Sequence, residues 1–273
     1  MISSLRRFVL FAGTAAAACL CAASPASAAD LRDYCPDRPG MGTPACTIDP
    51  GHASIEVGLA DWTLDRQGGT RTDDFAFGDT LVRYGLTDTL EVQAGWTAIG
   101  FERVRDGAGT VRRQTGSGDL RLALRQNLIH PDGSGFSVAV MPVVSLPTGS
   151  DPLGAGTWGA SLIVPASWKL PHGLQLDFTS EVDAAPDADR HGRHLAYSGV
   201  LGLDADLGHD VEATFELAEM HDEDPTGSSD QLLGGLALAW TAKPDLQVDI
   251  GTNVGLSRDA PDVELYAGVS RRF

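Results

Sequence analysis

The chain has 273 residues and a formal net charge of −17, with 42% hydrophobic and 21% charged residues. It is too polar for a bundle of membrane-spanning helices, which needs several runs of about 20 apolar residues, and too apolar for a disordered chain. The acidic balance argues against nucleic acid as a partner, because a nucleic-acid-binding protein needs a basic face. A chain of this length forms one or two domains, and all-β barrels of this size are commonly single units.

Residues 1–28 have the pattern of a secretory signal peptide. Two arginines precede the short apolar stretch Phe8–Ala23, and Ala26-Ser27-Ala28 supplies the small-x-small pattern of a cleavage site. The apolar stretch is too short for a comfortable membrane-spanning helix, so we expect cleavage near Ala28. Lipoprotein cleavage before Cys19 is the alternative, but the residues preceding Cys19 lack the usual leucine.

From residue 53 onward, apolar and polar residues alternate with a period of two, and no segment shows sustained helical periodicity. The run from Leu246 to Leu256 is a clear case. In a strand, this spacing places apolar side chains on one face and polar side chains on the other. Twelve such segments are expected, at residues 53–64, 72–85, 89–103, 117–128, 136–147, 157–170, 174–184, 194–207, 211–220, 231–242, 246–256 and 262–273.

The connections between these segments alternate in length. Short ones lie at residues 86–88, 130–135, 171–173, 208–210 and 243–245, and most of the others are longer, such as 104–116, 148–156, 186–193 and 221–230. Short turns at one end and long loops at the other are typical of bacterial outer-membrane barrels, whose short turns face the periplasm. We therefore expect an all-β fold: a single 12-stranded antiparallel transmembrane β-barrel over residues 53–273, with both termini periplasmic.

The face assigned to lipid carries no charge near the middle of the third to twelfth strands. Glu102, Glu219 and Arg271 share its parity but lie at strand ends. A lipid-facing charge near the bilayer midplane costs about 2–4 kcal/mol, so this absence is what a membrane wall requires. The second strand does not keep one parity, which indicates a β-bulge.

The opposite face is expected to line the lumen, and it carries eleven acidic against four basic residues. The lumen-lining residues that we single out are Glu91, Asp119, Arg121, Arg125, Asp177, Glu181, Asp204, Glu212, Glu216, Asp249, Glu264 and Arg272. Their acidic excess predicts a negative potential along the passage and a preference for cations.

A soluble periplasmic sandwich or barrel would show the same alternation with its apolar face inward, and it stays an alternative. Aromatic residues favour the membrane barrel, because they gather near the short turns and again near the long loops, as interfacial girdles do. The first group is Tyr84, Phe136, Trp168 and Trp240, and the second is Trp62, Trp158 and Tyr197. The last strand ends in Phe273, which resembles the signal read by the barrel assembly machinery. We therefore expect this machinery, outer-membrane lipid and lipopolysaccharide as partners, in a Gram-negative outer membrane.

Several short motifs occur in order along the mature chain. They are Cys35-Pro36-Asp37-Arg38-Pro39-Gly40, Gly42-Thr43-Pro44, Cys46-Thr47-Ile48, Gly51-His52-Ala53-Ser54-Ile55-Glu56-Val57-Gly58, Tyr84-Gly85-Leu86-Thr87, Gly118-Asp119-Leu120 and Leu146-Pro147-Thr148-Gly149. Their order and spacing resemble the family called putative MetA-pathway of phenol degradation transporters. The resemblance spans most of the mature chain and implies an outer-membrane barrel for small, often aromatic or hydrophobic, compounds. It carries over no catalytic residues.

The segment of residues 29–52 is rich in proline and glycine and lacks strand periodicity. Its two cysteines, Cys35 and Cys46, are expected to pair in an oxidising periplasm and close a short loop, rather than to bind zinc. The segment either hangs in the periplasm or folds back as a plug or cap, and the plug is slightly favoured because plugged lumens are common in such barrels. Its charged residues are Arg32 and Arg38, which would suit an acidic interior, and Asp30, Asp33, Asp37 and Asp49, which would not.

No arrangement of residues predicts an enzyme or a cofactor. The seven histidines all lie in expected turns, loops or strand ends, and none takes the position beside Ser180 that a Ser-His pair would need. His191-Gly192-Arg193-His194 and His221-Asp222-Glu223-Asp224 could supply ligands to a structural ion, but clustered acids in an exposed loop are usually solvated surface. We therefore expect no catalytic residues, no cofactor and no metal site, with a structural ion as the alternative.

Pro142 and Pro165 lie in the middle of adjacent expected strands, where each removes a backbone hydrogen-bond donor. They predict a kink or bulge, and the alternative is a lateral gap through which an apolar solute could leave. Barrels of about eight strands are filled by side chains and those of about sixteen or more enclose wide channels, so twelve strands predict a narrow passage. Porin-like passage of small, hydrophobic or aromatic molecules is the leading hypothesis, followed by a structural or adhesion-type protein and, far behind, a barrel enzyme.

Overall fold

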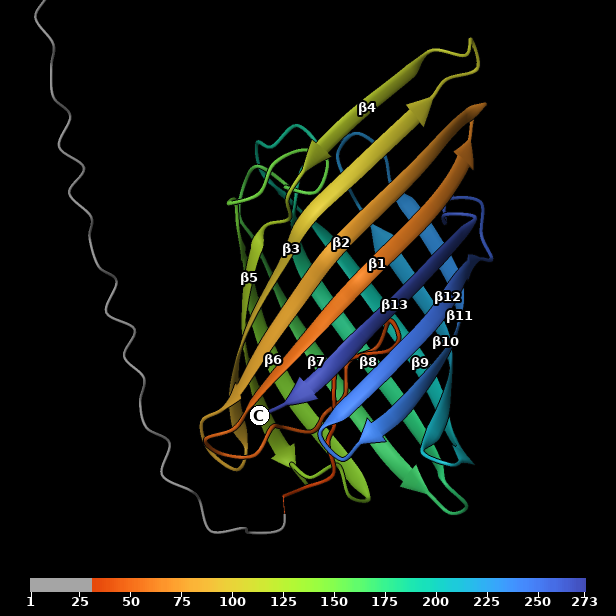
Figure 1. Ribbon diagram of the computed structural model, residues 1–273. Coiled ribbons are helices and arrows are strands. Elements are labelled where there is room, and N and C mark those ends of the chain that lie inside the picture. Colours follow the sequence, from red (N-terminus) through yellow and green to blue (C-terminus); the bar gives the residue numbers. More distant parts are fainter. Residues whose placement is uncertain (1–30) are drawn as a thin grey trace, which may run out of the picture. The chain divides into compact units, whose positions relative to one another are not determined.

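The computed structural model describes residues 31–273, of which residues 32–273 form one compact unit. The predicted signal peptide, with its cleavage alternative at Cys19, and Asp30 lie outside the described residues. The strands are β1 Ala53–Gln67, β2 Thr70–Gly85, β3 Leu90–Arg105, β4 Val111–Gly116, β5 Leu120–Ile129, β6 Phe136–Leu146, β7 Gly159–Leu170, β8 Leu174–Pro186, β9 Arg193–Gly208, β10 Val211–Asp222, β11 Ser229–Lys243, β12 Leu246–Gly255 and β13 Val263–Arg272 (Figure 1). Within the described range, no helix is long and apolar enough to cross a membrane.

The strands form a closed antiparallel barrel. Apart from β4 and β5, which both pair with β3, each strand pairs with its chain neighbours, and β13 returns to β1 from Ser54↔Arg272 to Leu64↔Val263, which closes the ring. β4 and β5 together occupy one place in this ring, because β4 pairs with β3 over residues 100–105 and β5 pairs with the same strand over residues 90–95. The predicted 12-stranded barrel is therefore confirmed.

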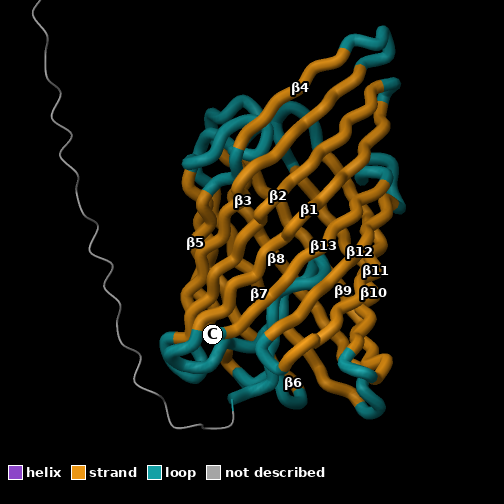
Figure 2. The backbone as a smooth tube through the Cα atoms, in the orientation of Figure 1, coloured by secondary structure: helices purple, strands orange, loops and turns teal. Residues whose placement is uncertain are grey.

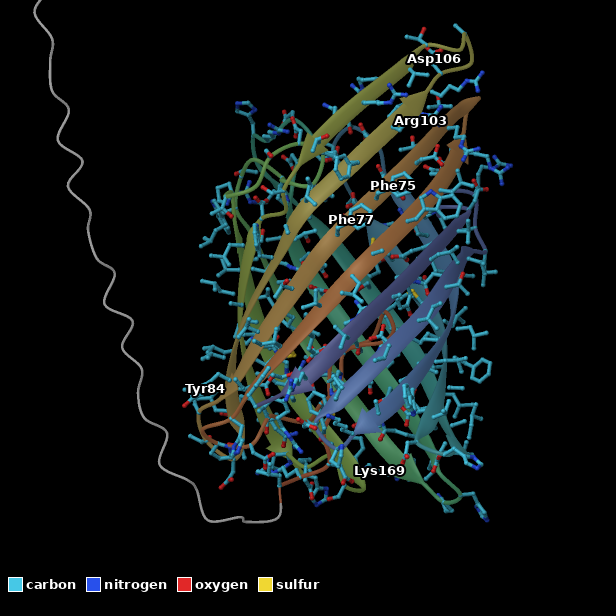
Figure 3. The ribbon with its side chains drawn as sticks, viewed as in Figure 1. Phe75, Phe77, Tyr84, Arg103, Asp106 and Lys169 are labelled. Atoms are coloured by element: carbon cyan, nitrogen blue, oxygen red, sulfur yellow. A yellow bond between two sulfur atoms is a disulfide. The ribbon has the colours of Figure 1, made fainter. Side chains whose placement is uncertain are left out.

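The connection expected at residues 104–116 is largely β-structure instead of loop. β3 continues to Arg105, and β4 runs back beside it as a hairpin that projects beyond the neighbouring strands (Figure 1). Figure 3 shows Arg103 and Asp106 on this projection. Both faces of such a hairpin meet water, so its sequence lacks the apolar alternation that predicts strands inside a membrane.

The inner face of the barrel is polar and its outer face is apolar, the reverse of a soluble fold. Large apolar side chains such as Phe215 and Ile250 are more than half exposed on the outside. Glu91 and Arg125 are fully buried on the inside. An apolar outer surface around a closed sheet is the arrangement that lipid requires. The alternative of a soluble sandwich with its apolar face inward is therefore wrong.

Aromatic side chains lie on the outside near both ends of the barrel. Six of the seven expected girdle residues are exposed, namely Tyr84, Phe136, Trp168, Trp240, Trp158 and Tyr197, and Trp62 is half-buried. Figure 3 places Tyr84 and Lys169 toward the end with the short turns. Such belts hold a barrel at the two membrane interfaces.

Three neighbouring strands are irregular at the same height. β1 shifts its register against β13 between Gly58 and Ala60, and the β2–β3 ladder skips Gly78 and Ala98. Gly78 has φ +67°, which glycine adopts without strain, so it forms the bulge expected in the second strand.

The bulge at Ala98 reverses the facing of the residues that follow in β3. Phe101 is exposed on the outer face, so Glu102 points to the inner face, where it lies 3.6 Å from Arg112. The assignment of Glu102 to the lipid face is therefore wrong, because one extra residue exchanges the two faces of a strand.

The two mid-strand prolines interrupt pairing locally. The β5–β6 ladder skips Pro142, and the β6–β7 ladder skips Pro165, whereas the β7–β8 ladder runs through Pro165 without a break. Each proline lacks the N–H that a ladder needs on one side. Pairing resumes within a few residues on both sides of each interruption.

Candidate functional site

The N-terminal segment, residues 32–52, lies inside the barrel toward the end with the short turns (Figure 1, red to orange). Its backbone amides reach strands around the ring. The amide of Ile48 donates to Glu91 of β3 at 2.7 Å, and the amide of Met41 donates to Glu216 of β10 at 2.7 Å. Figure 2 shows the same segment as a coil within the ring of strands. The segment therefore crosses the lumen, and a disulfide between Cys35 and Cys46 closes its loop.

Two buried arginines of the wall bind the segment through Asp37. Nη1 of Arg83 lies 3.0 Å from a carboxylate oxygen of Asp37, and Nη2 of Arg125 lies 2.8 Å from it. The same arginines contact Glu91, at 2.9 and 3.3 Å, and Arg83 also contacts Glu56 at 3.2 Å. A buried charge is costly unless it is paired and hydrogen-bonded, and here every charge has a partner.

These ion pairs overturn the expectation that Asp37 and Asp49 of the segment would be unfavourable in the lumen. Asp37 faces Arg83 and Arg125, and Asp49 lies 3.2 Å from Arg272. The expectation is wrong because the basic residues of the lumen gather toward the short-turn end, where the segment lies. Burial raises the pKa of Asp37, but Arg125 and Arg83 lower that pKa to below its usual value.

The other half of the segment contacts the opposite wall. Arg38 pairs with Asp249 of β12 at 2.8 Å, and its guanidinium stands 5.5 Å from the ring centre of Tyr266. Glu216 accepts the amides of Met41 and Gly42 at 2.7 and 2.8 Å. Gly40 has φ +108°, and a Cβ there would lie 2.8 Å from the Glu216 carboxylate, so this approach requires glycine.

A cavity of about 460 Å³ lies in the lumen next to this segment. Charged and apolar groups line it together, because the wall here comes from the irregular parts of β1, β2 and β3. The lining residues are Arg38, Gly58, Ala60, Asp61, Ala76, Asp79, Thr97, Gly118, Asp119, Arg121, Ser145, Leu153, Ala155 and Tyr266.

The connection between β6 and β7 folds into the barrel and covers part of this cavity. Asp119 accepts the amides of Gly149 and Ala155 at 2.7 and 2.8 Å, which holds the loop inward. Leu153 of the loop lies against Gly100, where a Cβ would meet it at 2.4 Å. The cavity thus lies between an inward loop and the N-terminal segment.

A second group of acids lies in the lumen near the short turns. Gln175 donates to Asp177 at 3.1 Å and to Asp204 at 3.3 Å, so its amide bridges two carboxylates. Glu212 neighbours Asp204 and Lys169. Like charges at such separations repel, and the bridging amide offsets part of that repulsion.

The twelve predicted lumen residues all belong to the inner face, but they form separate groups. Glu91, Arg125, Glu216, Asp249 and Arg272 contact the N-terminal segment, while Asp119 and Arg121 line the cavity. Asp177, Asp204 and Glu212 form the acidic group near the short turns, Glu181 lies beside Asp183, and Glu264 accepts from Asn253 at 2.7 Å.

Four residues of the site are not predicted by the alternation in the sequence: Glu56, Asp61, Asp79 and Arg83. All four lie on β1 or β2, where bulges at Gly58–Ala60 and Gly78 break the parity that identified inner positions elsewhere. The alternation is nevertheless present in the part of β1 before its bulge, where Ser54, Glu56 and Gly58 alternate with Ile55 and Val57. Treating each strand as two half-strands would have recovered them.

A family model described as "Putative MetA-pathway of phenol degradation" matches residues 36–273. No curated protein matches the chain significantly. The COG4313 outer membrane channel from Pseudomonas putida F1 has a similar fold, with a TM-score of 0.66 and 15% identity over 86% of this chain and 99% of that one. The Ralstonia pickettii toluene transporter TbuX is similar with a TM-score of 0.50 and 11% identity, over 89% and 99% of the two chains.

Proposed function

Since this chain belongs to the family described as "Putative MetA-pathway of phenol degradation", we propose that it is an outer-membrane channel for small molecules, hydrophobic and aromatic ones included. The observation that carries the proposal is the lumen cavity of about 460 Å³. An apolar cavity of about 150 Å³ holds a benzene molecule, so this cavity admits a single aromatic ring together with water.

The cavity lining suits a solute with an apolar body and one polar group. Leu153, Ala76 and Ala60 offer apolar contacts, and Arg121 and Asp61 offer a hydrogen-bond donor and an acceptor. Ligand sites commonly combine apolar walls with a few polar groups that fix orientation. The printed name of the Ralstonia pickettii structure gives toluene as that protein's solute, which is a ring of the same size class.

Uptake by whole cells tests the proposal, because apolar solutes cross simple lipid vesicles unaided. Cells lacking the protein are compared with cells that express it, for phenols, aromatic acids and sugars of similar mass. We expect faster accumulation of single-ring aromatic solutes with the protein present. Equal accumulation of every solute would favour a structural or adhesion role.

A pair of variants on β2 links uptake to the cavity. Ala76→Trp places a large side chain among the lining residues, whereas Val82→Trp places the same side chain on the outer face. We expect the first to abolish uptake and the second to leave it unchanged, with both proteins folded by heat-modifiable gel mobility. Unchanged uptake with Ala76→Trp would separate transport from this cavity.

The orientation proposed for the barrel places the short turns in the periplasm, as in other outer-membrane barrels. It is tested with single cysteines and a membrane-impermeant thiol reagent on intact cells. Ala108→Cys, in the β3–β4 hairpin, should be labelled, and His172→Cys and Lys243→Cys, at short turns, should not. The reverse labelling pattern would show that the short turns face the cell exterior.

A further inference from the structure

Two loops that are distant in sequence bring one histidine and three aspartates together at the long-loop end. Asp187 follows β8, His194 is the second residue of β9, and Asp222 and Asp224 lie at and beyond the end of β10. Oδ1 of Asp187 lies 2.9 Å from Nδ1 of His194, and Oδ2 of Asp224 lies 3.5 Å from the same nitrogen. The three ligand atoms all lie within 4.8 Å of one another.

These separations match the edge of a metal coordination shell. Bonds of about 2.0–2.1 Å to nitrogen and oxygen place tetrahedral ligands about 3.3 Å apart. The side chains are also withdrawn from water, since only 7% of His194 and 12% of Asp187 and of Asp224 is exposed. One imidazole and two carboxylates leave a fourth position for water or another small ligand.

The second nitrogen of His194 faces the carboxylate of Asp222. Nε2 is buried and has no hydrogen bond of proper geometry among the described residues, although Oδ1 of Asp222 lies 3.1 Å away. A metal on Nδ1 would fix the proton on Nε2, facing Asp222. A carboxylate in this place orients a metal-binding imidazole and raises its basicity.

The surrounding backbone holds the ligands in position before any ion arrives. The amide of Ala188 donates to Oδ2 of Asp224 at 2.7 Å, which ties the β8–β9 loop to the β10–β11 loop. The amide of Thr226 donates to Oδ1 of Asp224 at 2.7 Å, and the amide of Asp224 donates to Asp222 at 2.9 Å. A site held in this way loses little conformational entropy on binding.

We propose that Asp187, His194 and Asp224 bind one divalent first-row transition-metal ion, with Asp222 as a positioning residue. The imidazole selects this class over Ca²⁺ and Mg²⁺, which prefer oxygen ligands only. The bound ion joins the loops after β8 and β10 over the long-loop end of the barrel. Three histidines lie in the runs 191–194 and 221–224 that the sequence suggested as ligand sources, and of these only His194 belongs to the site. His191 is exposed, and His221 contacts Glu223 and Asp230 instead.

The test uses the full folded barrel, purified without a polyhistidine tag and freed of metal with a chelator. Zn²⁺ is titrated in competition with a chromophoric chelator, and Co²⁺ binding is followed by its visible absorption, which reports coordination geometry. We expect one Zn²⁺ per barrel and a tetrahedral Co²⁺ spectrum. Ca²⁺ and Mg²⁺ at the same concentration should not displace either ion.

The variants separate coordination from loop structure. His194→Ala, Asp187→Asn and Asp224→Asn should each abolish stoichiometric Zn²⁺ binding, and Asp222→Asn should weaken it about 10–100-fold. His191→Ala and Asp189→Asn, exposed residues of the same loop, should leave it unchanged. All proteins are first checked for barrel folding by heat-modifiable gel mobility.

Three results would overturn the proposal. The first is no stoichiometric Zn²⁺ or Co²⁺ binding by the unmodified barrel, which would leave His194 as a histidine hydrogen-bonded among carboxylates. The second is Zn²⁺ affinity that survives His194→Ala. The third is Ca²⁺ binding as tight as that of Zn²⁺, which would indicate acidic oxygens alone.

Discussion

Arg83 and Arg125 share the carboxylates of Asp37 and Glu91, and neither arginine has any exposed side-chain surface. The fully buried Glu56 joins the same group through Arg83. Replacing buried ion pairs by apolar residues is often neutral, but removing one partner leaves an uncompensated charge. The N-terminal segment is therefore held by a network in which each member depends on the others.

Loss of one arginine from this network should release the segment. Arg125→Gln leaves Asp37 and Glu91 each short of a partner, and breaking a buried pair in this way costs about 3–5 kcal/mol. Limited proteolysis within residues 35–49 of the folded barrel measures the release. Arg121→Gln is the matched control on the same strand, because Arg121 is 59% exposed and lies 3.9 Å from Asp79, and exposed pairs contribute at most about 1 kcal/mol. Equal protection of both variants would contradict the role assigned to Arg125.

Acid should release the segment through Asp37. Burial raises the pKa of Asp37, but Arg125 and Arg83 lower it to below its usual value. The pKa of Asp37 is therefore lower when the segment is bound in the lumen than when the segment is released. Asp37 contributes its full stabilisation to the bound state above the free-aspartate pKa of about 3.9, and this contribution is lost as the pH falls through the pKa of the bound state. Protection from an acid-active protease should stay constant from pH 7 to about 5 and fall below about 4. Asp37→Asn removes this contribution, so a pH profile identical to that of the unmodified protein would contradict the prediction.

At the scale of the element, the sequence predicts a strand well where its parity runs unbroken through the membrane. β8 and β12 meet this condition: Asp177 of β8 shares the amide of Gln175 with Asp204 in the lumen, and Asp249 of β12 pairs with Arg38. β1, β2 and β3 do not, because one extra residue at each bulge exchanges the faces halfway along. The N-terminal segment has no period to read, and its partners lie up to 240 residues away, as for Arg32 and Arg272. Its composition could suggest a plug but could not identify the contacts that seat it.

Transport should depend on displacement of the N-terminal segment. The amide of Thr43 donates to Oγ1 of Thr179 at 3.0 Å, and that hydroxyl donates back to Thr43 at 3.1 Å, so cysteines at both positions can cross-link the segment to β8. Oxidised Thr43→Cys/Thr179→Cys should show no solute uptake above cells without the protein, and reduction should restore it. Thr43→Cys alone, under the same oxidant and reductant, is the control, because reductant also acts on the native disulfide. Full uptake by the cross-linked protein would mean that the solute leaves by another route, such as the irregular wall beside Gly58 and Gly78.

In the whole molecule, the twelve strands enclose a lumen that two separate segments of the chain narrow. One is the N-terminal segment, bound by buried ion pairs, and the other is the β6–β7 loop, drawn inward by Asp119. The cavity between them has a volume of about 460 Å³ and several charged lining residues, so we expect its charge to influence which ions pass. The acidic excess predicted from the inner face is reduced by the arginines near the short turns but persists around the cavity.

We predict that the conductance of the barrel favours cations. Arg38 is neutralised by Asp249 at 2.8 Å, and Arg121 is the remaining base of the cavity, against Asp79 and Asp119. Acidic groups in a narrow, water-poor passage attract cations and repel anions. Reversal potentials in planar bilayers under a salt gradient should therefore lie on the cation side, and Asp79→Asn with Asp119→Asn should move them toward zero. Glu219→Gln, an exposed strand-end position of the outer face, should not change them. An anion-selective reversal potential would refute the predicted cation preference. The absence of any conductance at all voltages would show that the N-terminal segment closes the lumen to ions.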